Sequence, residues 1–193
     1  MDFEPFDLTE FSSEDDFIVP NTIERVRLGA AKMLAYLVHD GQKYYMPLNK
    51  EIPYIVHVET VVKKVKSLPR PLIEHDLLSV AWLHDTVEDT SITLGQLKPI
   101  FGTRISSAVE AITKNKDESY TEYVARCCKN RLSVHVKYAD LAVNLENTML
   151  LAKFPHQEQR VQDFKSKYIP AIEYIRKNFN LNYRHIVPGY DIE

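Results

Sequence analysis

The chain has 193 residues, of which 45% are hydrophobic and 26% are charged, and its formal net charge is −3. This length accommodates one domain with a sizeable core, and the composition is ordinary for a globular protein. The small negative charge argues against a nucleic-acid polymer or an anionic membrane as partner, while a local basic pocket for a phosphorylated small molecule is allowed. An oligomer is compatible with these properties.

The ends of the chain and its cysteines bear on its location. No apolar stretch approaches the roughly 20 residues of a membrane-spanning helix, and the first residues do not resemble a signal peptide. Cys127 and Cys128 are adjacent and are expected to be free thiols, so we expect a cytoplasmic protein. Residues 1–20 hold seven acidic residues and no basic one, which predicts an acidic N-terminal arm. Residues 181–193 are expected to form a C-terminal tail, leaving a domain at 21–180.

Between these ends, apolar residues recur at helical spacing, and no alternating strand pattern of useful length is present. Glycine and proline mark the ends of helices, with Gly41 after the first and Pro69 and Pro71 after the second. Residues 42–53 are expected to form a loop. The expected helices span residues 21–39, 54–68, 72–87, 93–101, 103–116, 119–129, 131–152 and 156–179. The sequence therefore predicts an all-α protein, a compact single-domain bundle.

The third expected helix joins a predominantly apolar run, 77–83, to the polar stretch His84-Asp85-Thr86-Val87-Glu88-Asp89-Thr90. Burying an imidazole and three carboxylates is costly unless these groups have partners. A metal ion is a natural partner, because neutral imidazole and carboxylate are its ordinary ligands. The alternative is a polar helix end whose acidic side chains are solvated.

Two other expected helices carry ligand-type residues on apolar faces. His57 ends the run Pro-Tyr-Ile-Val-His, and Asp140 lies one helical turn before Asn144. Two imidazoles and two carboxylates would suit an ion such as Mn²⁺, Fe²⁺ or Zn²⁺. Glu88 lies one turn past His84, where a carboxylate could accept a proton from the attacking water. Asn144 could orient that water or a phosphate oxygen.

Taken in order, three blocks resemble the HD-domain hydrolases of the RelA/SpoT type, and in length the chain is most similar to a free-standing small alarmone hydrolase. The blocks are Pro-Tyr-Ile-x-His, His-Asp-Thr-Val-Glu-Asp-Thr and Lys-x-Ala-Asp-x-x-x-Asn. The dipeptide His-Asp alone is a weak signal, since it recurs at His39 and His75, but the seven-residue block is specific. The resemblance covers about residues 21–180 and implies a helical fold of the HD-domain type.

The resemblance also implies roles for individual residues. Those that would hold one divalent metal, usually Mn²⁺, are His57, His84, Asp85 and Asp140. Glu88 would act on the attacking water with support from Asp89, and Asn144 would position water or substrate. Lys114 would lie near the phosphates, and Arg160 would lie on a helix that covers the pocket.

Three residues that could contact the substrate are less firmly assigned. Lys114 is equally well explained as a lysine facing the dipole at a helix C-terminus. Lys43 is assigned to the phosphates or the base from its position alone. Tyr44 and its neighbour Tyr45 could stack on a base or pack against the bundle.

The chain also departs from the family. Leu141, Val143 and Glu146 replace an arginine, a histidine and an arginine, and the segment between Gln42 and Pro53 is longer than usual. In the family this segment packs against guanine. The resemblance thus implies removal of the 3′-pyrophosphate of ppGpp or pppGpp, the alarmones of the stringent response, by metal-activated water. The alternatives are another nucleotide substrate, an adenosine alarmone or NADPH, and a non-catalytic metal- or nucleotide-binding module.

Overall fold

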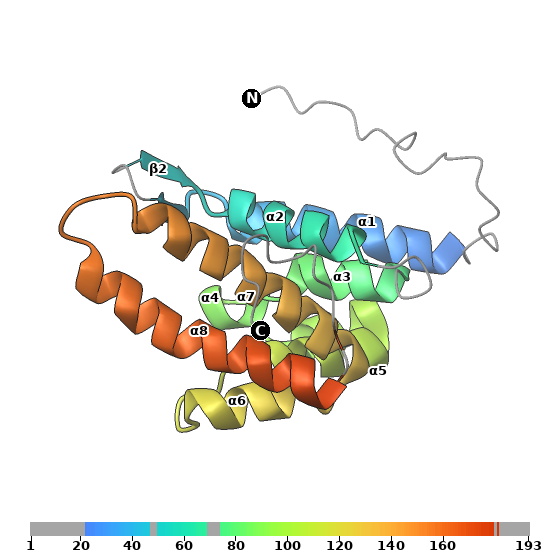
Figure 1. Cartoon of the computed structure of the whole chain (residues 1–193). Helices are drawn as coiled ribbons and strands as arrows, with labels where there is room; N and C mark the ends of the chain where they lie inside the picture. The colour runs from blue at the N-terminus through green and yellow to red at the C-terminus, as the bar shows by residue number, and fades with distance from the viewer. Residues whose placement is uncertain (1–21, 47–49, 69–73, 180, 182–193) are drawn as a thin grey trace.

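Helices make up almost all of the regular structure in the computed structural model, which describes residues 22–46, 50–68, 74–179 and 181. The helices are α1 Thr22–Val38, α2 Ile55–Lys66, α3 His75–Leu83, α4 Thr86–Asp89, α5 Leu94–Ile112, α6 Tyr120–Cys127, α7 Arg131–Leu151 and α8 Glu158–Phe179. The prediction of an all-α bundle is confirmed (Figure 1). The predicted acidic arm, and all of the predicted tail except Leu181, lie outside the described residues.

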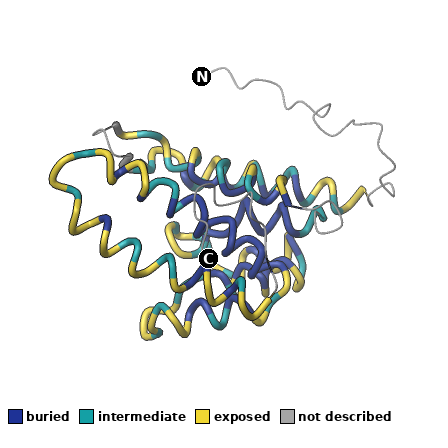
Figure 2. The backbone as a smooth tube through the Cα atoms, viewed as in Figure 1, coloured by how far each residue is buried: buried dark blue, intermediate teal, exposed yellow. Residues whose placement is uncertain are grey.

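The core is organised around α3 and α7. Helix α7 contacts α2, α3, α5, α6 and α8, and most of its residues are buried, as expected for a helix with neighbours on several sides (Figure 2). It begins at Asn130, whose side-chain oxygen accepts hydrogen bonds from the backbone N–H groups of Leu132 and Ser133. Helix α3 packs between α1, α2, α5 and α7, and residues 77–83 are all buried. Polar side chains on α3 and α7 are therefore placed inside the bundle.

The prediction of a loop over residues 42–53 is wrong, because this segment contains a hairpin of β1 (Lys43–Met46) and β2 (Lys50–Pro53). The strands are antiparallel, with Lys43 opposite Pro53 and Met46 opposite Lys50. Strands of four residues are too short to show an alternating pattern. Pro53 is tolerated because it ends its strand.

The prediction of a single helix over residues 72–87 is also wrong, because the helix is interrupted at His84 and Asp85, between α3 and α4. Asp85 has φ −100° and ψ −3°, and α4 begins at the next residue. On a continuous helix, the side chains of neighbouring residues diverge by about 100°. The break allows the side chains of His84 and Asp85 to approach each other, which a regular helix would disfavour.

Helix α5 contains the kink that the sequence predicts as a boundary between two helices. Gly102 has φ 80° and ψ 170°, a conformation that favours glycine. The predicted cap is present as well, since Thr93 and Gln96 form a reciprocal capping box. The helix ends at Ile112, and the segment that follows leads to α6.

Cys127 and Cys128 are free and buried, which confirms the prediction of free thiols. Burial raises the pKa of Cys127 to about 11 and that of Cys128 to about 12, so both thiols are poor nucleophiles near neutral pH. Among the helices of the described residues, none has both the length and the apolar character of a membrane span.

Candidate metal centre

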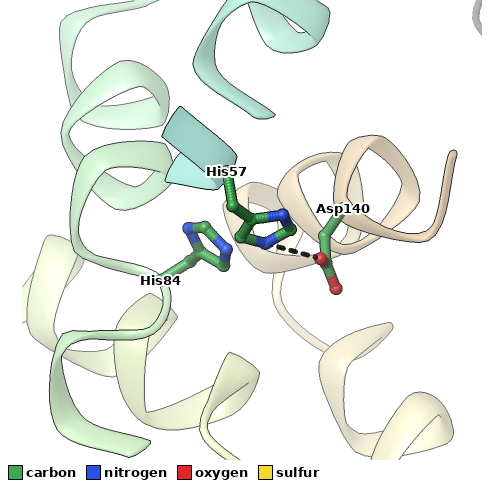
Figure 3. A group of neighbouring side chains, drawn as sticks. All are labelled: His57, His84 and Asp140. Carbon is green, nitrogen blue, oxygen red and sulfur yellow. Dashed lines mark ion pairs between the residues drawn. The ribbon is translucent and has the colours of Figure 1, made fainter. Parts of the chain in front are cut away.

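Three buried side chains from three parts of the bundle converge on one point (Figure 3). His57 comes from α2, His84 directly follows α3, and Asp140 comes from the middle of α7. One ligand atom from each lies within 4.8 Å of the others, and His57 Nε2 is 3.4 Å from Asp140 Oδ1. The helices that the sequence predicts to carry ligands therefore bring their polar residues together.

Asp85 joins the same cluster from the break between α3 and α4. Its Oδ2 atom is 2.9 Å from His84 Nε2 and 3.5 Å from His57 Nε2. All four predicted metal ligands are thus neighbours. We call His57, His84, Asp85 and Asp140 the metal cluster.

The orientation of His84 suits a metal ligand. Its Nδ1 atom donates a hydrogen bond to the carbonyl oxygen of Ala81 at 2.8 Å, which turns Nε2 toward the cluster. His84 Nε2 is buried and has no hydrogen-bond partner among the described residues, although Asp85 lies close to it. A buried nitrogen without a hydrogen bond, next to two carboxylates, fits a divalent cation of the borderline class.

The charges within the cluster favour a cation. Burial opposes ionisation of Asp85, but the neighbouring His84 lowers the pKa of this carboxyl to about 2. Burial likewise opposes a charged His84, yet Asp85 raises the pKa of this imidazole to about 9. The carboxylates therefore favour a positive charge at this point, whether a proton on His84 or a bound cation. A divalent cation can supply that positive charge in place of the proton.

Asp140 is held by two neighbours on its own helix. Lys137 Nζ donates to Oδ2 at 2.8 Å, and Asn144 Nδ2 donates to Oδ1 at 2.6 Å. Burial opposes ionisation of Asp140, but Lys137 keeps the pKa of this carboxyl far below its usual range. No role was predicted for Lys137, although it begins the third block and lies three residues before a predicted ligand on an apolar helix. Asn144 lies where it orients a ligand of the cluster.

Two tyrosines also contact the cluster. Tyr54 donates a hydrogen bond to Asp85 Oδ2 at 2.6 Å, which orients that carboxylate. Tyr44 stacks on His57 with ring centroids 5.3 Å apart, and its hydroxyl accepts a hydrogen bond from Asn147 at 3.0 Å. Of the two alternatives for Tyr44, the structure shows packing against the bundle, whereas the side chain of Tyr45 lies outside the described residues.

Glu88 and Asp89 are exposed residues of α4, the short helix that begins directly after Asp85. Glu88 Oε2 accepts a hydrogen bond from the backbone N–H of Lys114 at 2.9 Å. The backbone carbonyl of Asp89 accepts from Gln42 Nε2 at 2.9 Å. Partial burial raises the pKa of both carboxyls above their usual values. A carboxylate with a raised pKa is better suited to accept a proton near neutral pH.

The three residues predicted to bind substrate, Lys43, Lys114 and Arg160, each contact a different part of the protein. Lys43 pairs with Glu51 across the hairpin. Lys114 Nζ donates to the carbonyl oxygen of Asn115 at 3.2 Å, so the contact of Lys114 with Glu88 is made by its backbone. The guanidinium carbon of Arg160 lies 5.4 Å from the ring centroid of Phe164 on α8.

The comparisons with known proteins found relatives of this chain by sequence and by structure. No family model matches the chain. The human guanosine-3′,5′-bis(diphosphate) 3′-pyrophosphohydrolase MESH1 is 30% identical over 149 residues, which cover 70% of this chain and 79% of the relative. The zebrafish (Danio rerio) MESH1 is 28% identical over 149 residues, covering 74% of this chain and 77% of the relative.

Longer relatives match over a smaller share of their length. The guanosine-3′,5′-bis(diphosphate) 3′-pyrophosphohydrolase of Aquifex aeolicus is 28% identical over 116 residues, which are 56% of this chain but only 16% of the relative. A solved structure, described as a metazoan ortholog of SpoT that hydrolyses ppGpp, superposes with a TM-score of 0.58. It is 20% identical and covers 80% of this chain and 96% of that chain, which shows a shared fold.

The helical bundle is the fold of a hydrolase domain of the HD type. The chain belongs to the family of small guanosine-3′,5′-bis(diphosphate) 3′-pyrophosphohydrolases that includes MESH1. The resemblance carried by the three sequence blocks is confirmed.

Removing divalent metal with a chelator is expected to lower the Tm of the protein. An ion that binds only the folded state at 100 times its Kd contributes about 2.7 kcal/mol, which corresponds to roughly 5–10 °C for a domain of this size. Calorimetry of the Mn²⁺-loaded protein with and without chelator measures this change. A His84→Ala variant serves as the control, and an equal chelator effect in the variant would show that the ion binds elsewhere.

Proposed function

We propose that the chain is a metal-dependent phosphohydrolase that removes the pyrophosphate from the 3′ position of ppGpp or pppGpp. The observation that carries this proposal is the metal cluster, with Glu88 and Asp89 on the adjacent α4. The names of the MESH1 relatives support the choice of substrate. In this proposal residues 21–180 form the catalytic domain, which acts in the cytoplasm on a small phosphorylated nucleotide.

The metal cluster would hold one divalent ion, which we propose to be Mn²⁺, with Zn²⁺ or Fe²⁺ as alternatives. Such an ion would polarise a phosphate oxygen and make water a nucleophile at neutral pH. Tyr54, Lys137 and Asn144 hold the two carboxylates of the cluster in place. This support is expected to matter, because residues that orient metal ligands tune metal affinity and activity.

The proton transfer is assigned to Glu88. Its carboxylate takes a proton from the attacking water, and the backbone N–H of Lys114 orients that carboxylate. The water oxygen bonds to the phosphorus attached at the ribose 3′ position, the bond from that phosphorus to the ribose oxygen breaks, and this oxygen leaves as a hydroxyl after gaining a proton. Asp89 supports Glu88 from the same helix.

A different nucleotide is the second candidate for the substrate, because the residues that replace the family's arginines and histidine pack or form ion pairs within this protein. Leu141 and Val143 are buried in the core, with 0% and 2% exposure, and Glu146 pairs with Lys64. These positions therefore do not supply the cationic side chains that the family has there. Because these positions differ from the family, an adenosine alarmone or NADPH is the alternative substrate.

A nucleotide panel tests the proposal. Protein loaded with Mn²⁺ is incubated with ppGpp, its adenosine counterpart and NADPH, and the phosphate products are separated and quantified. We expect the wild-type protein to release pyrophosphate from ppGpp with the highest kcat/KM, and a His84→Ala variant to release none above the uncatalysed background. Turnover of another nucleotide with the highest kcat/KM would favour the second candidate. Binding without turnover of any nucleotide would indicate a binding module.

A further inference from the structure

One face of α8 places cations beside aromatic rings. Arg160, Phe164, Lys167 and Tyr168 share this face, because residues spaced by three, four or seven positions align on a helix. The rings of Phe164 and Tyr168 are stacked, with centroids 5.7 Å apart. Helix α8 runs beside α7, which carries Asp140, and contacts α6 (Figure 1). A basic and aromatic face thus adjoins the helix that holds a predicted metal ligand.

Lys167 is held where α8 meets α6. Its Nζ atom lies 4.5 Å from the ring centroid of Tyr120 on α6 and 5.5 Å from that of Tyr168. The ring of Tyr120 is shared with Lys137, whose Nζ lies 5.9 Å from the same centroid. Lys137 in turn binds Asp140. A single aromatic ring therefore separates Lys167 from the side chains that support the metal cluster.

The charges near Lys167 come from several elements. Partial burial lowers the pKa of Lys167, and the nearby positive charges of Lys137 and Lys114 lower it further, while Asp140 and Glu88 oppose them. Within the described part of the chain, Lys167 forms no ion pair with a carboxylate. Cations brought together in this way repel one another unless an anion joins them. Lys167 is therefore held by aromatic rings, and the carboxylates assigned to metal binding and proton transfer act on it electrostatically without an ion pair.

We propose that Lys167 binds the phosphate groups of the substrate and of the released pyrophosphate. The rings of Tyr120 and Tyr168 limit the positions of its ammonium group, so that little freedom is lost when a phosphate oxygen binds. The ligand class is a compound with two adjacent phosphates, and Lys114 is the second cation near them. This inference rests on the proposed function only in that a phosphorylated nucleotide occupies the side of the metal cluster that faces α8.

The test compares three variants of the full, Mn²⁺-loaded chain. Lys167→Met removes the charge and keeps the length of the side chain, Lys167→Arg keeps the charge, and Lys165→Met removes a lysine from another face of the same helix. Calorimetric titration with inorganic pyrophosphate measures Kd for each. We expect Kd to rise about tenfold or more in Lys167→Met, as for the loss of one charge-assisted hydrogen bond, and to change little in Lys167→Arg and Lys165→Met. The KM for ppGpp should rise by a similar factor.

The outcomes separate this inference from the proposed function. If ppGpp is not hydrolysed but pyrophosphate binding depends on Lys167, the inference stands and the proposed function fails. If ppGpp is hydrolysed while Lys167→Met leaves both Kd and KM unchanged, the inference fails alone. An equal loss of binding in Lys165→Met would indicate a general effect of charge and would also overturn it. The same conclusion follows if the wild-type protein does not bind pyrophosphate.

Discussion

Replacing His84 by alanine is expected to abolish tight metal binding and to lower kcat/KM for ppGpp by more than about 100-fold. Residues that merely orient metal ligands contribute 10- to 100-fold, so a lost ligand should cost at least as much. His84 Nε2 is buried and lies 2.9 Å from Asp85, so alanine would also leave that carboxylate without its nearest positive partner. Metal content, measured by elemental analysis of the purified protein, and steady-state kinetics check the two effects.

His75 provides the matched control for His84. It belongs to another His-Asp dipeptide and begins α3, but it is not part of the metal cluster. His75→Ala should therefore retain both metal and activity. Equal losses in His75→Ala and His84→Ala, or full activity of His84→Ala, would contradict the assignment of the cluster.

Replacing Glu88 by glutamine is expected to lower kcat by about 10²- to 10⁴-fold with the metal still bound, because general-base catalysis commonly contributes this much. Glutamine has a similar size, and its side-chain oxygen can still accept the hydrogen bond from the Lys114 backbone N–H. The KM should change much less than kcat, since the proton is transferred only in the reaction step. Glu110→Gln, on the exposed side of α5, is the control.

The pH dependence of Glu88 has a definite sign. Burial raises the pKa of this carboxyl above its usual value, and only the ionised form accepts a proton. The kcat of the wild-type protein should therefore fall as the pH decreases through that raised pKa, whereas Glu88→Gln should lack this decrease. A variant with unchanged kcat, or with the same acidic limb as the wild type, would exclude Glu88 as the base.

The convergence of the metal cluster was predictable from the sequence for a physical reason. His57 and Asp140 lie on helices whose apolar faces must be buried in one core, and His84 follows a predominantly apolar run whose residues are all buried. Polar residues on such helices can only meet inside the bundle. The proximity of the four predicted ligands therefore followed from burial and from the order of the three blocks.

Other features depend on contacts between distant segments, which helical periodicity does not report. The helix break at Asp85 places the Asp85 side chain beside His84, whereas a continuous helix would direct the two side chains apart. The apolar run before it contains no residue that predicts the end of a helix. The hairpin that carries Tyr44 is set by pairing between two strands of four residues each. The hydrogen bond from Tyr54 to Asp85 links residues 31 positions apart. Each of these shapes the site, and none has a local sequence pattern.

The segment after Gln42 was predicted to influence the choice of substrate, and its structure changes how it could do so. Gln42 accepts a hydrogen bond from His39 at 2.7 Å and donates to the backbone of Asp89, so it connects α1 to α4. Tyr44 packs on His57. The start of the hairpin therefore supports the metal cluster, in addition to any contact that the segment makes with a nucleotide.

Anomalous diffraction at the manganese absorption edge tests the central claim most directly, using crystals of the full chain grown with Mn²⁺. The account predicts one strong peak at coordination distance from His57, His84, Asp85 and Asp140. A peak bound by other residues, or no peak at this cluster in active protein, would contradict it.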